Sequence, residues 1–509
     1  MRLTFMAGIA TVASLSGAVL VPSALTAQPG GGVAPQCSID QNTPKELALM
    51  SLKFQSARSA ATPDARKKVL RDIIKELDTK PERFAKNPGG YNLTLVQALT
   101  MWGVEPGIVD APARSELGFI TNPTEPYDII VNMDVAYKAI IAAVPTCETD
   151  VTAMRMNEVW LAATKSALDA SNAGKLDSAE YFAKRSMMMS ATNPYPHYVL
   201  ASVANARNNR PNAIMHWKHV VKYAADDTTY RDLKNSSMYY AAMSQLEDAQ
   251  AKTGAEQQAT AREAAEGFKA LLTATPDSPD APNLLLSWAD ALTVAKDTAL
   301  IPTVYTSLLT QASATDISLA TAGVIATRAN KSDDALKLFK AATVKNPFNR
   351  DAQRNVAAAH YTKDQYTLMF EPARKLVELD PNNFDGWMLF AYASQGLAKA
   401  AQTAKKPIEV KAWTDSLVKY QTYAEALPVK VDVTSFDRRK DVATLILALE
   451  QVAAKDGQYS VTAEFLDIAG AVVATATEAA GPIKKGETKS VTLKVTGTGI
   501  MSYRYKALK

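Results

Sequence analysis

Histidine and cysteine are scarce in this sequence, which limits the chemistry that it can carry. Its 509 residues include four histidines and two cysteines. It contains no G-x-S-x-G elbow, no Gly-rich phosphate loop and no H-E-x-x-H pair, the motifs of three common enzyme chemistries. Carboxylates are plentiful, but none lies in an apolar pattern typical of a glycosidase pair. We therefore expect a protein with no catalytic residue and no cofactor.

An excess of charge of one sign is also missing. Lys and Arg number 56 against 52 Asp and Glu, which leaves a net charge of +4. Binding to nucleic acid needs clustered Lys and Arg, so we expect no nucleic-acid partner. Hydrophobic residues make up 47% and charged residues 21%, a balance typical of a chain that folds around a core.

Long apolar runs are absent after the first residues. The opening, "MRLTFMAGIATVASLSGAVLVPSALTAQ", has Arg2 followed by an apolar run of about seventeen residues, typical of a secretory signal cleaved after Ala27. A membrane anchor is the alternative, although the run is marginal for spanning. We predict a signal peptide at 1–27, a flexible Gly- and Pro-rich tether at 28–42, and a periplasmic or secreted protein with no integral membrane segment after signal removal.

The two cysteines, Cys37 and Cys147, suit that compartment, because an even count in an oxidising space favours pairing. A bridge between them would close a loop of about 110 residues, worth about 4 to 5 kcal/mol in the chain-entropy model. Two alternatives remain open. A lipid on Cys37 would need small residues before it, where the chain has Pro35 and Gln36, and two free thiols would need a reducing compartment.

Only two histidines are neighbours in the sequence, His216 and His219 in "AIMHWKHVVKY". They lie at i and i+3 on one helical face and could share a metal ion, but a site wants a third and a fourth ligand. Asp226 and Asp227 follow the end of the predicted helix. We expect two polar residues that flank a buried Trp217, and no metal site.

Residues 43–427 have a helical pattern nearly throughout, with a fixed period. Pro347 and Pro381 are 34 residues apart, and so are Ala179 and Ala213. Helices separated at this period by short Pro, Asn or Asp breaks predict stacked helix pairs.

The motif "DDALKLFKAATVKNP" gives this period a physical cause. Ala335 and Ala342 let the two helices of a pair approach closely, and Phe339 fills the space between neighbouring pairs. Pro347 ends the second helix and forces the turn. The same spacing recurs in "AAEGFKALLTATP".

This 34-residue unit resembles the tetratricopeptide repeat, as it occurs in exported bacterial proteins. The resemblance covers residues 160–427 with about six units, interrupted by an insertion around "DDTTYRDLKNSSMYY". It implies a helix–turn–helix array that stacks into a superhelix. Residues 43–159 form an N-terminal helical region, in which we expect an irregular excursion at 87–127 because that stretch is rich in turn formers.

Beyond residue 427 the apolar period changes from about 3.6 to 2, as in "YSVTAEFLD" and "SVTLKV". About six or seven short strands predict a small immunoglobulin-like β-sandwich at 428–509. The module is similar to the FxLYD type, which "EFLDIAG" matches in part. The predicted fold class is therefore mostly α, a tetratricopeptide-type superhelix followed by a small all-β sandwich domain.

The resemblance to tetratricopeptide arrays also implies a binding groove. In such arrays the first helix of each unit lines the concave face, with ligand contacts at its second, fifth, ninth and twelfth positions. Carried onto this chain, these contacts are Tyr195, Tyr198, Asn205, Asp351, Arg354, Tyr361, Asp385, Met388, Tyr392 and Gln395. Tyrosine, asparagine and arginine on such a wall suit an extended peptide.

We thus predict an exported, non-enzymatic scaffold that binds a protein or peptide partner in the cell envelope. The alternative is glycan or nutrient capture on an aromatic platform that includes Trp102, Trp160, Tyr195 and Tyr198. The sequence leaves the partner's identity and the oligomeric state unknown.

Overall fold

The computed structural model describes residues 37–509, so the predicted signal peptide at 1–27 and most of the tether at 28–42 lie outside the described residues. The chain divides into two compact units, of which the first ends at Val159 and the second runs from Trp160 to Lys509. Among the helices that the structure describes, none is both long enough and apolar enough to span a membrane.

The first unit is helical. Its α-helices are α1 (Lys45–Ser59), α2 (Pro63–Thr79), α3 (Pro88–Gly103), α4 (Arg114–Leu117), α5 (Ile129–Ala143) and α6 (Glu148–Met154), with short 3-10 turns η1 (Pro81–Phe84) and η2 (Pro145–Cys147). The Thr62 side chain caps α2 by accepting a hydrogen bond from the Ala65 amide. Helix α2 buries one apolar stripe, which includes Leu70, Ile73 and Leu77.

Cys37 and Cys147 form a disulfide, as predicted. The bond joins the segment before α1 to η2, directly after α5. Cys147 is fully buried. The start of the described chain is therefore covalently fixed to the last part of the first unit.

The predicted excursion at 87–127 is wrong for its first half, because Pro88–Gly103 forms the regular helix α3. The glycines that suggested a turn are needed for packing. A Cβ on Gly90 would lie 2.3 Å from the carbonyl oxygen of Asp40, so only glycine lets this segment lie against the helix. The side chain of Asn87 caps α3 by accepting from the Gly90 amide. Residues 104–128, which include α4, remain mostly irregular.

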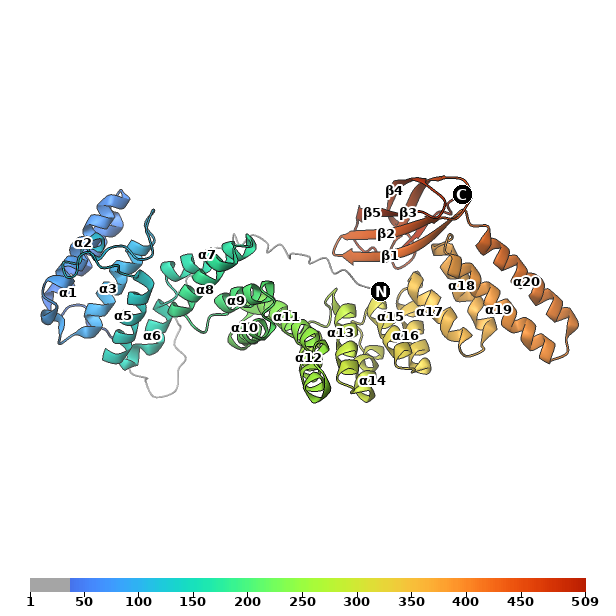
Figure 1. Cartoon of the computed structure of the whole chain (residues 1–509), viewed down its shortest axis with the longest axis horizontal. Coiled ribbons are helices and arrows are strands. Elements are labelled where there is room, and N and C mark those ends of the chain that lie inside the picture. Colours follow the sequence, from blue (N-terminus) through green and yellow to red (C-terminus); the bar gives the residue numbers. More distant parts are fainter. Residues whose placement is uncertain (1–36) are drawn as a thin grey trace. The chain divides into compact units, whose positions relative to one another are not determined.

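The second unit begins with consecutive helix pairs, which Figure 1 shows following one another from α7 to α20. The α-helices are α7 (Glu158–Asn172), α8 (Leu176–Met189), α9 (Pro194–Ala206), α10 (Arg210–Ala224), α11 (Arg231–Gln250), α12 (Gly254–Ala274), α13 (Ala281–Val294), α14 (Ile301–Tyr305), α15 (Asp316–Arg328), α16 (Ser332–Lys345), α17 (Arg350–Tyr361), α18 (Phe370–Leu379), α19 (Phe384–Thr403) and α20 (Pro407–Glu425). Short 3-10 turns η3 (Thr228–Tyr230), η4 (Thr298–Leu300), η5 (Thr306–Leu309) and η6 (Tyr366–Met369) connect some of them.

The turn inside a pair repeats the predicted period. One residue with a left-handed backbone follows the first helix of six pairs; besides Lys405, which follows the longer α19, these are Gly174, Asn208, Lys296, Asn330 and Asp364. The first two are 34 residues apart, and the last three are spaced by 34 and 34. A left-handed residue ends a helix by redirecting the chain. The tetratricopeptide-type helical repeat is therefore confirmed as the fold of this part of the chain.

The apolar residues of the repeat motif are buried, but the close contact of Phe339 is with the other helix of its own pair, whereas the sequence predicted a filler between neighbouring pairs. Ala335, Phe339 and Ala342 are buried. The Phe339 ring of α16 lies so close to Gly323 of α15 that a Cβ there would approach it to 2.4 Å. The aromatic ring therefore packs where the facing helix has a residue without a side chain.

The register breaks between the second and the fourth pair. Helices α11 and α12 have 20 and 21 residues, and η3 precedes α11. The additional residues of this region thus lengthen a helix pair.

The chain continues with six strands in two three-stranded antiparallel sheets, ordered β1-β2-β5 and β4-β3-β6. The strands are β1 (Val429–Arg439), β2 (Val442–Gln451), β3 (Gly457–Leu466), β4 (Val472–Ile483), β5 (Thr488–Thr496) and β6 (Ser502–Tyr505). Side chains from both sheets, such as Leu445 and Phe465, share one buried core. This confirms the small all-β module, whereas its membership of the FxLYD type stays a prediction.

The β module is hydrogen-bonded to the turns that join successive helix pairs. Asn382, in the turn before α19, donates to the carbonyl oxygens of Val429 and Leu508 and accepts from the Leu508 amide. The backbone amide of Asn382 donates to the Tyr505 hydroxyl at 3.1 Å. Asn382 is 1% exposed, so these groups are satisfied away from water.

Two further turns make equivalent contacts. Asp316, at the start of α15, pairs with Arg438 of β1. Asn346, in the turn before α17, donates to the Met501 carbonyl at 3.0 Å. In the turn before α19, Asp380 accepts from the Tyr505 hydroxyl and from Arg350. The carboxylates of these turns thus hold the β module on the array.

Candidate functional site

Seven of the ten predicted groove residues lie together on the first helices of two neighbouring pairs. On α17 these are Asp351, Arg354 and Tyr361, and on α19 they are Asp385, Met388, Tyr392 and Gln395. Their spacing of three, four or seven residues places them along one face of each helix. We call this set the α17/α19 stripe.

Two contacts link the helices of the stripe. Arg354 donates to Asp385 with a nitrogen–oxygen distance of 2.8 Å. The rings of Tyr361 and Tyr392 lie 5.8 Å apart between centroids. These rings are 44% and 41% exposed, so both still present aromatic surface to a ligand.

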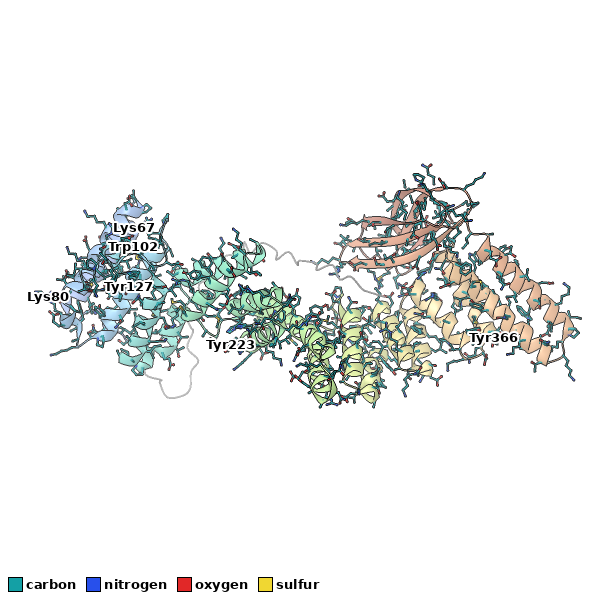
Figure 2. The ribbon with its side chains drawn as sticks, viewed as in Figure 1. Lys67, Lys80, Trp102, Tyr127, Tyr223 and Tyr366 are labelled. Atoms are coloured by element: carbon teal, nitrogen blue, oxygen red, sulfur yellow. A yellow bond between two sulfur atoms is a disulfide. The ribbon has the colours of Figure 1, made fainter. Side chains whose placement is uncertain are left out.

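The stripe opens into a cavity of about 460 Å³ between α17, α19 and α20. Tyr361 and Tyr392 line it together with Tyr366 of η6, which is labelled in Figure 2. Gln395 and Lys399 add a polar edge. We call this cavity the tyrosine pocket. Its phenol rings and amide suit one apolar side chain next to a hydrogen-bonding backbone.

Tyr366 was not among the predicted site residues, because it follows the end of α17 and belongs to no regular helix position. Its ring lies directly over Gly396 of α19, where a Cβ would approach the ring to 2.3 Å. The hydrogen bond that its hydroxyl donates to Asp364 raises the pKa of Tyr366. The phenol is thus held as a neutral wall of the pocket.

The opposite end of the stripe meets the β module. Asp351 lines a smaller cavity of about 240 Å³ together with residues of α15, β1 and β6. The neighbouring Arg350 is buried and binds both Asp351 and Asp380. The α17/α19 stripe therefore runs from the edge of the β module to the tyrosine pocket.

The other three predicted residues lie on α9, which three helix pairs separate from α17. Tyr195 is half-buried, and its ring centroid lies 5.6 Å from that of Tyr230 in an edge-to-face arrangement. Tyr198 packs on the buried cluster that contains Trp217. Burial raises the pKa of both Tyr195 and Tyr198. Asn205 is exposed. The structure thus brings seven predicted residues into one stripe and leaves these three in another repeat.

The tryptophans of the alternative aromatic platform do not offer a surface. Trp102 is 2% exposed and Trp160 is 9% exposed. Figure 2 labels Trp102, and the Lys67 ammonium lies 5.9 Å from its ring. The prediction of these two rings as a glycan platform is therefore wrong, because they pack inside the fold.

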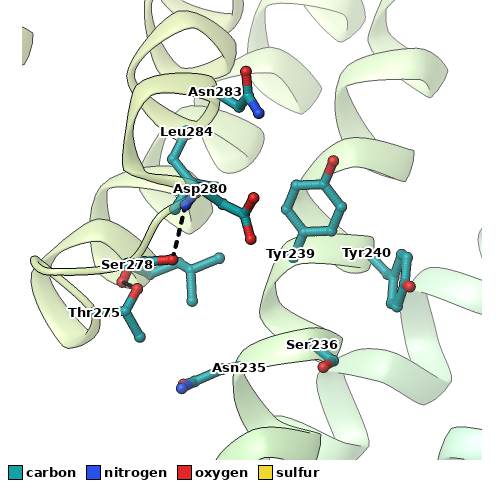
Figure 3. Close-up of a pocket in the computed structure, with 10 residues that line it drawn as sticks. Asn235, Ser236, Tyr239, Tyr240, Thr275, Ser278, Asp280, Asn283 and Leu284 are labelled. Atoms are coloured by element: carbon teal, nitrogen blue, oxygen red, sulfur yellow. Dashed lines mark hydrogen bonds between the residues drawn. The ribbon is translucent and has the colours of Figure 1, made fainter. Parts of the chain in front are cut away.

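A further cavity, of about 500 Å³, lies between α11 and the start of α13 and was not predicted. Figure 3 shows the carboxylate of Asp280 directed toward the ring of Tyr239, and the Asp280 amide donates to the Ser278 hydroxyl at 3.2 Å. Asp280 also approaches Arg439 of β1, at 3.3 Å. One carboxylate, phenols and amides provide polar contacts for a ligand.

Three histidines converge between α9 and α10, although the sequence suggested two. His197 of α9 joins His216 and His219 of α10, and one side-chain nitrogen of each lies within 4.8 Å of the others. Burial, with the neighbouring His197 and His219, lowers the pKa of His216 to about 4. Trp217 is buried between the two histidines of α10, as expected. His197 escaped the prediction because it lies in another helix, 19 residues before His216.

The two aspartates considered as further ligands have other partners. Asp227 accepts from the Thr229 amide at 2.8 Å and starts η3. Asp226 lies 3.6 Å from the Lys234 ammonium. Neither belongs to the histidine cluster.

No protein-family profile and no curated protein sequence matches the chain. Among solved structures, yeast Tom70 aligns over 77% of this chain and 67% of its own, with 13% identity and a TM-score of 0.26. The TPR2AB domain of yeast Sti1 in complex with pHSP90 aligns over 52% and 98%, with 12% identity and a TM-score of 0.22. Pseudomonas aeruginosa pilF aligns over 52% of this chain and 96% of its own, with 10% identity and a TM-score of 0.20. TM-scores this low carry no argument, so the repeat assignment rests on the helix pairs themselves.

Proposed function

We propose that this chain is a non-enzymatic scaffold whose second unit binds an extended segment of a protein partner along the α17/α19 stripe. The observation that carries the proposal is the tyrosine pocket at the end of that stripe, where the exposed rings of Tyr361 and Tyr392 flank a cavity of about 460 Å³. Aromatic anchors of this kind supply most of the energy in many protein interfaces.

The chemistry of the stripe favours a peptide with one apolar anchor residue. The rings of Tyr361, Tyr366 and Tyr392 provide apolar contact area, while Gln395 and Lys399 can hydrogen-bond to peptide carbonyls. Further along the stripe, Arg354 and Asp385 form an exposed pair that can exchange its partners for peptide groups. An anchor next to a polar track fits an extended backbone.

We also propose that the protein acts outside the cytoplasm, in the periplasm or beyond it. The signal-like opening of the sequence supports export, and the Cys37–Cys147 disulfide is compatible with an oxidising compartment.

The test is selection of peptides from a random display library, followed by measurement of their affinity by fluorescence polarisation. The double variant Tyr361→Ala plus Tyr392→Ala should weaken the selected peptides at least tenfold. Tyr181→Ala is the matched control, because Tyr181 is 46% exposed and lies on α8. It should leave the affinity unchanged.

Arg354→Ala separates binding from stability. An exposed ion pair contributes less than about 1 kcal/mol to folding, so this variant should melt at nearly the wild-type temperature. Equal affinity of all variants would refute the stripe as the binding surface. A glycan array run in parallel detects the alternative, since glycan binding without any selected peptide would replace the scaffold hypothesis.

A further inference from the structure

Three imidazole side chains from two neighbouring helices face one another inside the α9/α10 pair. We propose that His197, His216 and His219 form a binding site for one divalent late first-row transition-metal ion, of which zinc is the probe of choice. The site is independent of the proposed peptide surface, because three helix pairs lie between α9 and α17.

The first step of the argument is the orientation of His197. Its Nε2 lies 3.0 Å from the carbonyl oxygen of Ala191. A carbonyl can only accept, so Nε2 carries the hydrogen and the neutral ring keeps its lone pair on Nδ1. This Nδ1 lies 3.0 Å from Nδ1 of His216. A histidine fixed through one nitrogen by a backbone carbonyl, with the other nitrogen directed inward, has the arrangement of a metal ligand.

The second step is an unsatisfied nitrogen. Nδ1 of His219 is buried and has no hydrogen-bond partner among the described residues. A buried polar atom without a partner is unfavourable by about 1 to 3 kcal/mol, and few such atoms occur in folded proteins. A metal ion between the three rings would satisfy this nitrogen if it carries the lone pair.

The third step concerns distances. Zinc binds imidazole nitrogens at about 2.0 to 2.1 Å, which sets them about 3.4 Å apart in a tetrahedral site. One nitrogen of each histidine lies within 4.8 Å of the other two, so only a modest ring rotation is needed. His216 and His219 are one turn apart on α10, which lets both rings move toward the fixed His197.

The donor set selects the class of metal. Three imidazoles without a carboxylate or thiolate suit zinc, copper, nickel or cobalt, whereas magnesium and calcium require oxygen ligands. The ring centroid of Tyr223, which is labelled in Figure 2, lies 5.3 Å from the ring centroid of His197 and 5.6 Å from that of His219. The Lys222 side chain is exposed, and its ammonium lies 5.5 Å from the centroid of the Tyr223 ring. Water can take the remaining coordination position.

The experiment uses full-length protein purified without a polyhistidine tag. Cobalt(II) is titrated first, because its visible absorption reports coordination, and zinc is then added as a competitor. We expect one cobalt per chain, displaced by one zinc, and a higher melting temperature in zinc. Magnesium at the same concentration should have no effect.

The variants assign the site. His216→Gln plus His219→Gln should weaken zinc binding at least 100-fold, and His219→Gln alone at least tenfold. The matched control is His360→Gln, since His360 lies on α17 and bonds to Gln365 outside the cluster. It should keep wild-type affinity. If the double variant does not fold, the single variant decides.

Two results would overturn the proposal. One is a wild-type protein that binds zinc no more tightly than about 1 mM. The other is zinc affinity that is unchanged in His219→Gln, whether His360→Gln retains zinc binding or abolishes it.

Discussion

The side chain of Asn382 and the backbone of Leu508 exchange two hydrogen bonds, with donor–acceptor distances of 2.8 and 3.0 Å. One partner belongs to a turn between helix pairs, and the other follows the last strand of the β module. This pairing fixes the β module to the array at one asparagine, whose remaining amide hydrogen binds the Val429 carbonyl.

Asn382→Ala should detach this corner of the β module. The substitution leaves the Leu508 amide and two carbonyls buried without partners, so we expect a loss of about 2 to 4 kcal/mol in unfolding free energy. Hydrogen exchange should accelerate at Leu508 and at Val431, whose amide donates to the Asn382 carbonyl at 3.1 Å. Asn209→Ala is the control, because Asn209 only caps α10, by accepting from the Asn212 amide. Similar losses in both variants would contradict the special role of Asn382.

Gly396→Ala should close the tyrosine pocket. The new Cβ would lie 2.3 Å from the Tyr366 ring, so the ring must move. We expect the unfolding free energy to fall by about 1 to 3 kcal/mol. Calorimetry measures the loss, and peptide affinity should fall in parallel. In the double variant with Tyr366→Ala the clash is gone, so the two effects should be non-additive. Strict additivity would mean that the ring does not lie on Gly396.

Asp78 should give the first unit an acid-sensitive loop. Its carboxylate accepts hydrogen bonds from the Ile120 and Thr121 amides at 2.7 and 2.8 Å. Burial raises its pKa, but the hydrogen bonds from Thr121 and Ile120 and the charge of Arg114 outweigh burial, so the pKa lies below its ordinary value.

A lowered folded-state pKa means that Asp78 stabilises the fold at any pH above the ordinary carboxyl range. The contribution is lost as the pH falls through the folded-state pKa. The hydrogen-exchange protection factors of residues 118–123, which correct for the intrinsic pH dependence of exchange, should therefore fall below about pH 4 in the wild type. Asp78→Asn should lower the unfolding free energy by about 1 to 3 kcal/mol at neutral pH. In this variant the protection of residues 118–123 should also depend less on pH. An unchanged profile would refute the assignment.

Removal of the disulfide should destabilise the first unit alone. In the chain-entropy model a loop closed between residues 110 apart contributes about 4 to 5 kcal/mol. The double variant Cys37→Ser plus Cys147→Ser should therefore increase the rate of amide hydrogen exchange in α3 and α5. The α17 and α19 helices of the second unit serve as the internal control and should be unaffected. Equal protection of α3 with and without the bond would contradict this expectation.

The helical repeats could be predicted because their cause is local. Alanine, phenylalanine and proline at fixed offsets determine how each pair packs and ends, and each pair contacts mainly its neighbours. The buried Phe339 and the alternating core of the strands, such as Val461 and Phe465, follow from the same short-range patterns.

What escaped prediction depends on contacts between distant residues. Asn382 and Leu508 are 126 residues apart, and no local pattern marks them as partners. Gly90 suggested a turn, because no local pattern shows that the backbone carbonyl of Asp40, before α1, lies against it. His197 joins His216 only when α9 and α10 pack, so the cluster follows from the pairing of helices and not from either helix alone.

The docking of the β module also sets an order of assembly. Asp380 and Asn382 are synthesised more than a hundred residues before Tyr505 and Leu508, which later cover them. Until then the helix pairs present polar turns to water, where an aspartate and an asparagine are well solvated. The module thus converts solvated turns into a buried interface late in synthesis, and it also covers the apolar ring of Phe348, which lies against Gly470.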